Sequence, residues 1–264
     1  MKWHVVCKQF SNFTVISKYS FPFSVAAKMN RGRIISLHPE CVDVNEPRSD
    51  GFVSKLAEAV SSLKAGNVIA LPTDTIYGIA GLAQNSEAVN QIYHIKNRDL
   101  SNPIAVCVGR IQDVYKWSKV TISESLLSEL LPGPVTVVLR RGEELNPDLN
   151  PGVSLVGIRI PDHTFVRACA LSCNEPLVLT SANLSTTPST VAIQEFQHLW
   201  PKLDLIFDGG TLPKTEKQRL GSTVVDLSVP GKYRVIRKGS AYENTMNKLM
   251  HHKLEEIVTE QNSR

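Results

Sequence analysis

A buried strand that ends in a group of polar residues is encoded by Val68-Ile69-Ala70-Leu71-Pro72-Thr73-Asp74-Thr75-Ile76-Tyr77-Gly78. The apolar run stops at Leu71, and Pro72 cannot donate to a strand ladder, so hydroxyl and carboxylate groups follow directly at the strand end. In open α/β sheets, ligands usually bind where strands end. The segment therefore predicts one wall of a binding site, in a loop over residues 72–81. An ordinary turn in which Asp74 caps backbone amides would use the same residue types.

The segments on either side of this stretch predict one α/β domain. A helix is expected from about residue 49 to Gly66, and a second from about Ser86 to Ile95, because apolar residues recur there with helical spacing. Runs rich in β-branched residues predict strands at 104–108, 135–139, 156–160, 177–179, 205–207, 224–227 and 233–236, and helical segments are expected near 126–131, 165–171 and 193–199. Because strands and helices intermix without strict alternation, we predict a single domain with a twisted mixed sheet and flanking helices over residues 50–240. Residues 241–264 are expected to form a C-terminal helix and a frayed tail.

Charge is distributed unevenly along the chain. The 29 Lys and Arg and 25 Asp and Glu residues give a net charge of +4. Residues 1–39 hold six of the basic residues and no acidic one, so this segment carries +6 and the rest of the chain −2. A body with no excess of positive charge argues against stable, non-specific binding to nucleic acid.

The basic, acid-free start of the chain predicts a mitochondrial transit peptide within residues 1–48, because import sequences are basic and poor in acids. An untargeted tail is the alternative. Met29 offers a second start that would remove most of the segment, so we expect both a cytoplasmic and a mitochondrial form. No apolar run approaches the roughly 20 residues that cross a bilayer, and no lipidation motif supports membrane association. The five cysteines form no CxxC pair, which favours neither a disulfide framework nor a zinc site.

Common catalytic and nucleotide-binding signatures are absent. The chain has no GxxxxGK[ST], GxGxxG, HExxH or GxSxG motif and no histidine pair with metal-ligand spacing except the adjacent His251 and His252. No metal site is predicted. The candidates that remain are polar residues near the ends of predicted strands and helices.

Two pairs of polar residues are spaced two apart. Lys96 and Arg98 follow the second helix, and in extended chain both would point to one side and could bind one anion. Ser181 and Asn183 follow the strand at 177–179 and would present a hydroxyl and an amide in the same way. A solvated helix terminus and an ordinary turn are the respective alternatives.

Arg159 interrupts an otherwise apolar strand and so requires a fixed anionic partner. The partner is either an internal acidic residue or a ligand carboxylate held in bidentate fashion, and we favour the ligand. Ser222 opens a later strand as a plausible anion contact, and Arg237 closes the last strand with a further positive charge. The turn from Pro132 to Thr136 is expected to be architectural.

Eight ordered motifs resemble the YrdC/TsaC family of threonylcarbamoyl-AMP synthases. They are Pro72 to Gly78, Lys96 to Arg98, Asn102 to Ile104, Pro132 to Thr136, Val156 to Pro161, Thr180 to Asn183, Ser222 to Asp226, and Arg237 with Gly239. The resemblance covers roughly residues 50–240. It implies a twisted mixed sheet with a cationic groove. It also implies a nucleotidyltransferase that makes threonylcarbamoyl-AMP and pyrophosphate from L-threonine, bicarbonate or CO2, and ATP. The product would pass to a transferase complex that modifies the adenosine next to the anticodon of tRNAs.

The resemblance also implies roles for individual residues. Lys96, Arg98, Ser181 and Asn183 would form the catalytic, ATP-holding set, with Ser189 and Arg237 as further nucleotide contacts. Thr73, Arg159, Thr180 and Ser222 correspond to positions near threonine. Many relatives have His where this chain has Cys107, so that threonine contact is in question. Mg2+ is expected with ATP, held largely by the phosphates. A double-stranded RNA-binding or ribosome-maturation module is the alternative function.

Overall fold

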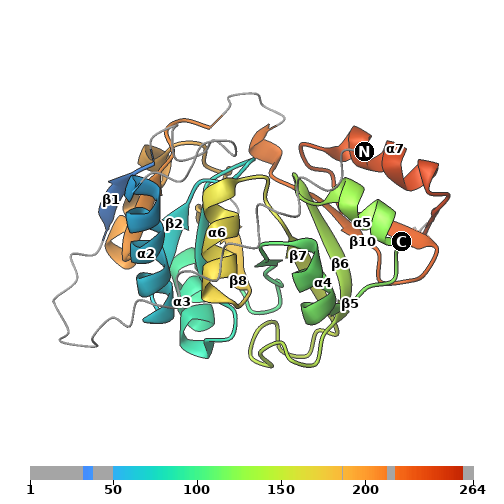
Figure 1. Ribbon diagram of the computed structural model, residues 1–264, viewed down its shortest axis with the longest axis horizontal. Helices are drawn as coiled ribbons and strands as arrows, with labels where there is room; N and C mark the ends of the chain where they lie inside the picture. Colours follow the sequence, from blue (N-terminus) through green and yellow to red (C-terminus); the bar gives the residue numbers. More distant parts are fainter. Residues whose placement is uncertain (1–31, 38–49, 186, 213–217, 258–264) are drawn as a thin grey trace, which may run out of the picture. The chain divides into compact units, whose positions relative to one another are not determined.

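The computed structural model describes residues 32–37, 50–185, 187–212 and 218–257. Met29 with the rest of residues 1–31, and the tail from residue 258, lie outside the described part, so the predicted transit peptide and frayed end are not addressed by it. The described strands form one twelve-stranded sheet in the order β1-β9-β2-β3-β8-β4-β7-β6-β10-β11-β12, with β5 paired to β6 (Figure 1).

The element bounds follow the chain order. The strands are β1 (Arg33–Ser36), β2 (Ile69–Leu71), β3 (Gly78–Leu82), β4 (Val106–Cys107), β5 (Ser118–Lys119), β6 (Val135–Arg141), β7 (Leu155–Arg159), β8 (Leu177–Ser181), β9 (Leu205–Asp208), β10 (Thr223–Asp226), β11 (Lys232–Arg237) and β12 (Glu255–Glu256). The helices are α2 (Asp50–Lys64), α3 (Ser86–Lys96), α4 (Ile111–Trp117), α5 (Glu124–Leu130), α6 (Thr164–Cys173), α7 (Tyr242–His251) and the 3₁₀ helices η3 (Ile193–Lys202) and η4 (Gln218–Leu220).

The predicted mixed sheet is confirmed by the pairing directions. Strand β2 pairs antiparallel with β3 and parallel with β9, while β7 pairs parallel with β4 and antiparallel with β6. Strand β8, which precedes the Ser181 turn, lies between β3 and β4 and is antiparallel to both. Strands β2, β7 and β8, which contain or precede predicted site residues, therefore belong to one sheet.

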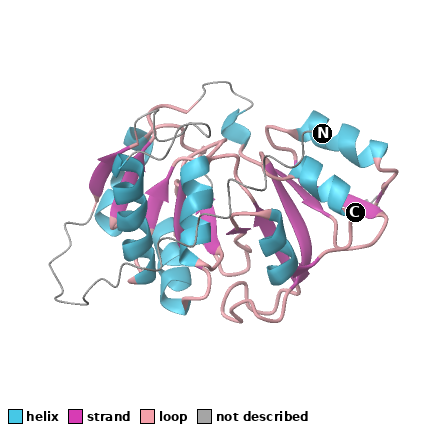
Figure 2. Ribbon diagram, viewed as in Figure 1, coloured by secondary structure: helices cyan, strands magenta, loops and turns pink. Residues whose placement is uncertain are grey.

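Helices α2 and α6 lie side by side against one face of the sheet, over its β9–β2–β3–β8 part (Figures 1 and 2). Their apolar residues, among them Phe52 and Phe165, pack with strand residues such as Phe207 in one buried cluster. Residues that alternate with these along the strands, such as Ile79 and Ile206, belong to a second cluster that includes the buried side of α3. Burial of both faces accounts for the continuous apolar runs that predicted these strands.

In the other part of the sheet, one strand face is left open to a pocket. Along β7, Val156 and Ile158 enter the apolar core, whereas Leu155, Gly157 and Arg159 line the pocket. The same alternation holds on β6, where Thr136 and Val138 line the pocket, and on β10, where Val224 does. Because successive side chains of a strand point to opposite faces, one face of these strands builds the core and the other builds the site.

Three elements differ from the sequence expectation. Residues 72–81, predicted as a loop, include strand β3, whose two glycines weaken the strand signal. Gly78 allows close packing there, since a Cβ at this position would lie 2.7 Å from Leu179 Cδ1 and 3.1 Å from the carbonyl oxygen of Thr180. Strand β1 lies within the segment assigned to residues 1–48, and pairs parallel with β9 over four residues. Helix α4 has only seven residues, too few for a clear periodic pattern.

The C-terminal helix packs on the domain rather than standing apart from it. Leu249 of α7 is fully buried in the core that also contains Leu126 and Leu130 of α5, and β12 pairs with β11 at the sheet edge. The folded unit therefore extends past residue 240. No helix in the described ranges combines the length and apolar character needed to cross a bilayer.

Candidate active site

The pocket has a volume of about 420 Å³ and lies over one face of β6, β7 and β10. A volume of this size suits a small ligand. One part is apolar, formed by Val138, Val153, Leu155, Val224 and Ile236. Seven predicted site residues line the remainder: Thr73, Arg98, Arg159, Thr180, Ser181, Ser222 and Arg237.

Three arginines give the pocket its charge. Arg98 follows α3, Arg159 ends β7 and Arg237 ends β11, so segments far apart in sequence deliver them to one place. Burial, with the repulsion of Arg159 and Arg98, lowers the pKa of Arg237. Burial also lowers the pKa of Arg98. Cations brought this close, in a partly dry pocket, form a site for one or more anions.

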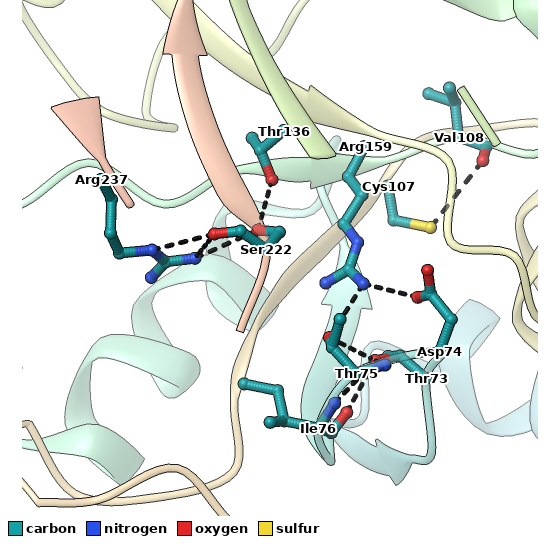
Figure 3. A network of polar contacts seen from close by, with 10 residues as sticks. All are labelled: Thr73, Asp74, Thr75, Ile76, Cys107, Val108, Thr136, Arg159, Ser222 and Arg237. Carbon is teal, nitrogen blue, oxygen red and sulfur yellow. Dashed lines mark hydrogen bonds and ion pairs between the residues drawn. The ribbon is translucent and has the colours of Figure 1, made fainter. Parts of the chain in front are cut away.

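Arg159 has an internal acidic partner, which corrects the preference for a ligand carboxylate. Its Nη2 donates to Asp74 Oδ1 at 2.5 Å and to Thr75 Oγ1 at 2.9 Å (Figure 3). The side chains of Arg159 and Asp74 are only 9% and 11% exposed. Both N–H groups of Nη2 are thus engaged, so a ligand carboxylate cannot be gripped in bidentate fashion through Nη2 while these bonds persist. Arg159 nevertheless lines the pocket and can still meet an anion through Nη1.

The loop after β2 is held by Thr73 rather than by Asp74. Thr73 Oγ1 donates to the carbonyl of Ile76 at 2.7 Å and accepts from the backbone N–H groups of Thr75 and Ile76 at 3.1 and 3.2 Å. The hydroxyl predicted to contact threonine is therefore part of a side-chain-capped turn. Asp74, expected as the cap in the alternative interpretation, is freed for its ion pair with Arg159.

Arg237, Ser222 and Thr136 form a second polar group on the opposite part of the pocket wall (Figure 3). Arg237 Nη2 donates to the carbonyl and to Oγ of Ser222 at 2.8 and 3.0 Å, and Ser222 Oγ shares a 2.8 Å hydrogen bond with Thr136 Oγ1. The turn ending at Thr136 was predicted to be architectural, yet Thr136 lines the pocket. The sequence did contain a signal for this position. Thr136 is a polar residue within an apolar strand, and it lies on the same face of the sheet as Arg159.

Lys96 is buried and does not line the pocket. It is the last residue of α3, and Asn97 ends the helix in the left-handed conformation, so the expectation of extended chain with Lys96 and Arg98 side by side is wrong. The ammonium Nζ lies within hydrogen-bonding distance of four oxygens: Ser181 O at 2.5 Å, Asn183 O at 2.7 Å, Asn183 Oδ1 at 3.3 Å and Ser181 Oγ at 3.4 Å. Burial and the neighbouring Arg98 lower the pKa of Lys96 to about 7.

The Ser181–Asn183 turn is consequently fixed from inside the protein. Asn183 is buried, and its Nδ2 donates to the carbonyl of Thr187 at 2.5 Å, so its amide is used locally rather than presented beside the Ser181 hydroxyl. Ser181 and Thr180 do line the pocket. Arg98 is placed by bonds from Nε and Nη2 to the carbonyls of Asn102 and Pro103, both at 3.0 Å.

Two predicted contacts lie outside the pocket lining. Cys107 is fully buried in the cluster under α6, its Sγ points to the carbonyl of Val108 at 3.8 Å, and burial raises the pKa of its thiol to about 12. It offers no polar contact to a pocket ligand. The carbonyl of Ser189 accepts from Arg219 Nη1 at 3.0 Å. Neither residue is brought to the pocket surface in this structure.

The described residues contain no cluster of three or more His, Cys, Asp or Glu side chains that could hold a metal ion. Asp74, the carboxylate in the loop after β2, is paired with Arg159. The pocket itself can hold anions beside an apolar surface.

Comparison with known proteins assigns the chain to a family. The sequence model of the Sua5/YciO/YrdC family, described as "Telomere recombination", matches residues 61–239. The threonylcarbamoyl-AMP synthase of Rattus norvegicus is 49% identical over 227 residues, which cover 85% of this chain and 81% of that protein. The threonylcarbamoyl-AMP synthase of Homo sapiens is 52% identical over 206 residues, covering 77% and 74%.

A solved structure shares the fold. Sua5 of P. abyssi, crystallised with L-threonine, matches with a TM-score of 0.69 at 26% identity, over 85% of this chain and 62% of that longer one. The chain therefore belongs to the Sua5/YciO/YrdC family.

Proposed function

We propose that this chain is a threonylcarbamoyl-AMP synthase, which makes L-threonylcarbamoyladenylate and pyrophosphate from L-threonine, bicarbonate or CO2, and ATP. The observation that carries the proposal is the likeness to synthases of this name over up to 85% of the chain at about half identical residues. The pocket agrees with it, because three arginines line it beside an apolar wall.

The reaction requires positioning more than acid–base catalysis. The amine of threonine adds to CO2 and loses a proton to give a carbamate. A carbamate oxygen then attacks the α-phosphorus of ATP, and the bond from that phosphorus to the pyrophosphate oxygen breaks. Negative charge grows on phosphate oxygens as pyrophosphate leaves, so fixed cations lower the barrier. Mg2+ bound to ATP would offset part of the same charge.

The proposed residue roles combine the resemblance with the contacts of each side chain. Arg98 and Arg237 bond to neutral oxygens and keep their full charge for the triphosphate. Arg159 would meet the threonine carboxylate, with Ser222, Thr180 and the Thr73 loop around the amino acid. Ser181 would contact the nucleotide. Lys96 and Asn183 would act by fixing the Ser181 turn, because both are buried and bonded within it.

Purified protein should release pyrophosphate from ATP only when threonine and bicarbonate are both present. Arg98→Ala should lower kcat/KM for ATP about a hundredfold, the scale of losing one charge-stabilising donor. Arg110→Ala is the matched control, because Arg110 is an exposed arginine paired with Asp113 outside this pocket. Release that ignores threonine would refute the proposal, and tight threonine-independent binding of duplex RNA would support the RNA-binding alternative.

The proposal extends to location and product transfer. The +6 charge of residues 1–39 supports import into mitochondria, and a start at Met29 would supply a cytoplasmic form. A reporter fused to residues 1–40 that stays out of mitochondria would refute the targeting. The labile mixed anhydride would be consumed by a separate transferase complex acting on tRNA, and this chain would need no stable nucleic-acid contact of its own.

A further inference from the structure

The three pocket arginines differ in the charge of their partners. Arg98 donates to two backbone carbonyls, and Arg237 donates to the carbonyl and hydroxyl of Ser222, so the bonds given for them involve neutral oxygens. Arg159 donates to the carboxylate of Asp74 at 2.5 Å. The pocket thus contains two arginines whose charge is not offset by these contacts and one whose charge is largely neutralised.

Two buried ionisable groups near this pair, His163 and Cys107, do not supply the counter-charge. Burial lowers the pKa of His163 to about 4, so its imidazole is neutral at physiological pH. Burial keeps the thiol of Cys107 protonated, with a pKa of about 12. Asp74 is therefore the group that balances Arg159, and the pair is nearly enclosed, which strengthens its mutual attraction.

Asp74 acts through Arg159 and not on a ligand. Its carboxylate is absent from the pocket lining, and its Oδ2 is buried without a hydrogen-bond partner among the described residues. The ion pair and the Thr75 bond use both N–H groups of Arg159 Nη2, and Arg159 Nε is buried and unpartnered within the described part of the chain. The guanidinium is held in one orientation, with Nη1 left for a pocket anion.

We propose that Asp74 is a positioning residue that reserves Arg159 for the single carboxylate of the amino-acid substrate and directs the polyphosphate to Arg98 and Arg237. A highly charged polyphosphate is drawn most strongly to cations that have no counter-ion, whereas a monoanion gains enough from one oriented, half-neutralised guanidinium. Without Asp74, Arg159 would become a third full charge and would compete for phosphate. This inference rests on the proposed synthase function.

Asp74→Asn tests the inference, because it keeps the side-chain shape and removes the charge. We expect the KM for threonine to rise about tenfold, the loss expected for a charge-assisted contact that is worth about 1.4 kcal/mol. Inorganic tripolyphosphate, which should compete only with ATP in the parent protein, should now also compete with threonine.

Two control variants accompany this test. Thr75→Val, which removes only a neutral acceptor from the same Nη2, should have a much smaller effect. Asp162→Asn, which removes an exposed carboxylate three residues after Arg159, should change neither value.

A double-variant cycle separates positioning from a loss of folding. If Asp74 acts through Arg159, Asp74→Asn should add nothing to the rise in threonine KM already caused by Arg159→Met, and calorimetric threonine binding should follow the same pattern. The double variant also leaves no unpaired buried charge that could unfold the protein. Additive effects, or an Asp74→Asn protein with unchanged threonine KM and unchanged tripolyphosphate competition, would overturn the inference. A parent protein without threonine-dependent pyrophosphate release would instead refute the proposed function.

Discussion

The amino group of Lys96 is used inside the protein. Lys96 is 1% exposed, and its Nζ lies among four oxygens of the Ser181–Asn183 turn, two of them backbone carbonyls. An ammonium has three donors and no acceptor, so this oxygen cage suits the charged form. The contacts join the end of α3 to the end of β8 across 85 residues of sequence. The lysine of the KxR motif thus holds the pocket turn in place.

Lys96→Met should impair the enzyme through this turn. Removing the donors leaves buried carbonyls unsatisfied, at a cost of about 1–3 kcal/mol. We expect urea unfolding to show a loss of that size and kcat/KM for ATP to fall at least about tenfold. Lys64→Met is the control, because Lys64 also ends a helix but is exposed. A variant with parent stability and reduced ATP affinity alone would mean that Lys96 contacts the nucleotide directly.

The lowered pKa of Lys96 predicts that the free energy of unfolding depends on pH. Burial and Arg98 lower the pKa of Lys96 from 10.5 to about 7 in the folded protein. Between these values the unfolded chain binds more protons than the folded one, so the free energy of unfolding should rise with pH across this window. Relative to Lys96→Met, the parent should gain stability between about pH 7 and about pH 9.5 in urea titrations. Parallel curves for the two proteins would show that Lys96 stays charged.

Residue chemistry could be predicted from the sequence where a side chain faces the pocket, as for Arg98 and Ser222. The role of a residue could not be predicted where that role depends on a partner far away along the chain. Asp74 and Arg159 are 85 residues apart, and no local pattern pairs them. The resemblance left a threonine contact at Cys107 in question. Cys107 is in register with Arg159 on the same face of the sheet, but apolar residues of α6 bury it there.

At the scale of elements, Gly239 lets the chain after β11 pack directly against the start of β10. A Cβ on Gly239 would approach backbone atoms of Ser222 and Thr223 to less than 3.0 Å. Backbone cannot move aside as a flexible side chain can. The glycine of the Arg237-x-Gly239 motif therefore allows the close approach that lets Arg237 reach Ser222.

Gly239→Ala should separate these two strands. We expect a loss of about 2–3 kcal/mol in the free energy of unfolding from overpacking, with a rise in KM for ATP because Arg237 shifts. Ser240→Ala is the neighbouring control, since the Ser240 hydroxyl is buried without a partner among the described residues. Chemical unfolding and steady-state kinetics of both variants check the prediction. Equal, small effects from the two substitutions would contradict the packing argument.

Elements built from long apolar runs, such as β6 and β7, were predictable because one face enters the core and the other supplies apolar residues to the pocket wall. Strand β3 was not, since its glycines serve close packing rather than strand propensity. Strand β1 has only four residues and lies beside a basic segment, so its pattern is too short to stand out. Pairing with β9, a long-range contact, defines it.

At the scale of the whole molecule, the sheet extends beyond the family match. That match ends at residue 239, yet α7 packs its Leu249 into the common core and β12 adds a strand beside β11. The structure also shows where some of the basic residues behind the net charge of +4 lie. The body is slightly acidic as a whole, and three of its cations are gathered at one pocket, which suits small anions rather than an extended nucleic-acid surface.

The most direct test of the synthase assignment is mass detection of the adenylate formed by purified protein from ATP, threonine and isotopically labelled bicarbonate. The label should appear in threonylcarbamoyl-AMP, in equal amount to the pyrophosphate released, and product should vanish when threonine is omitted. Adenylate that lacks the label, or pyrophosphate released in equal amount without threonine, would contradict the account.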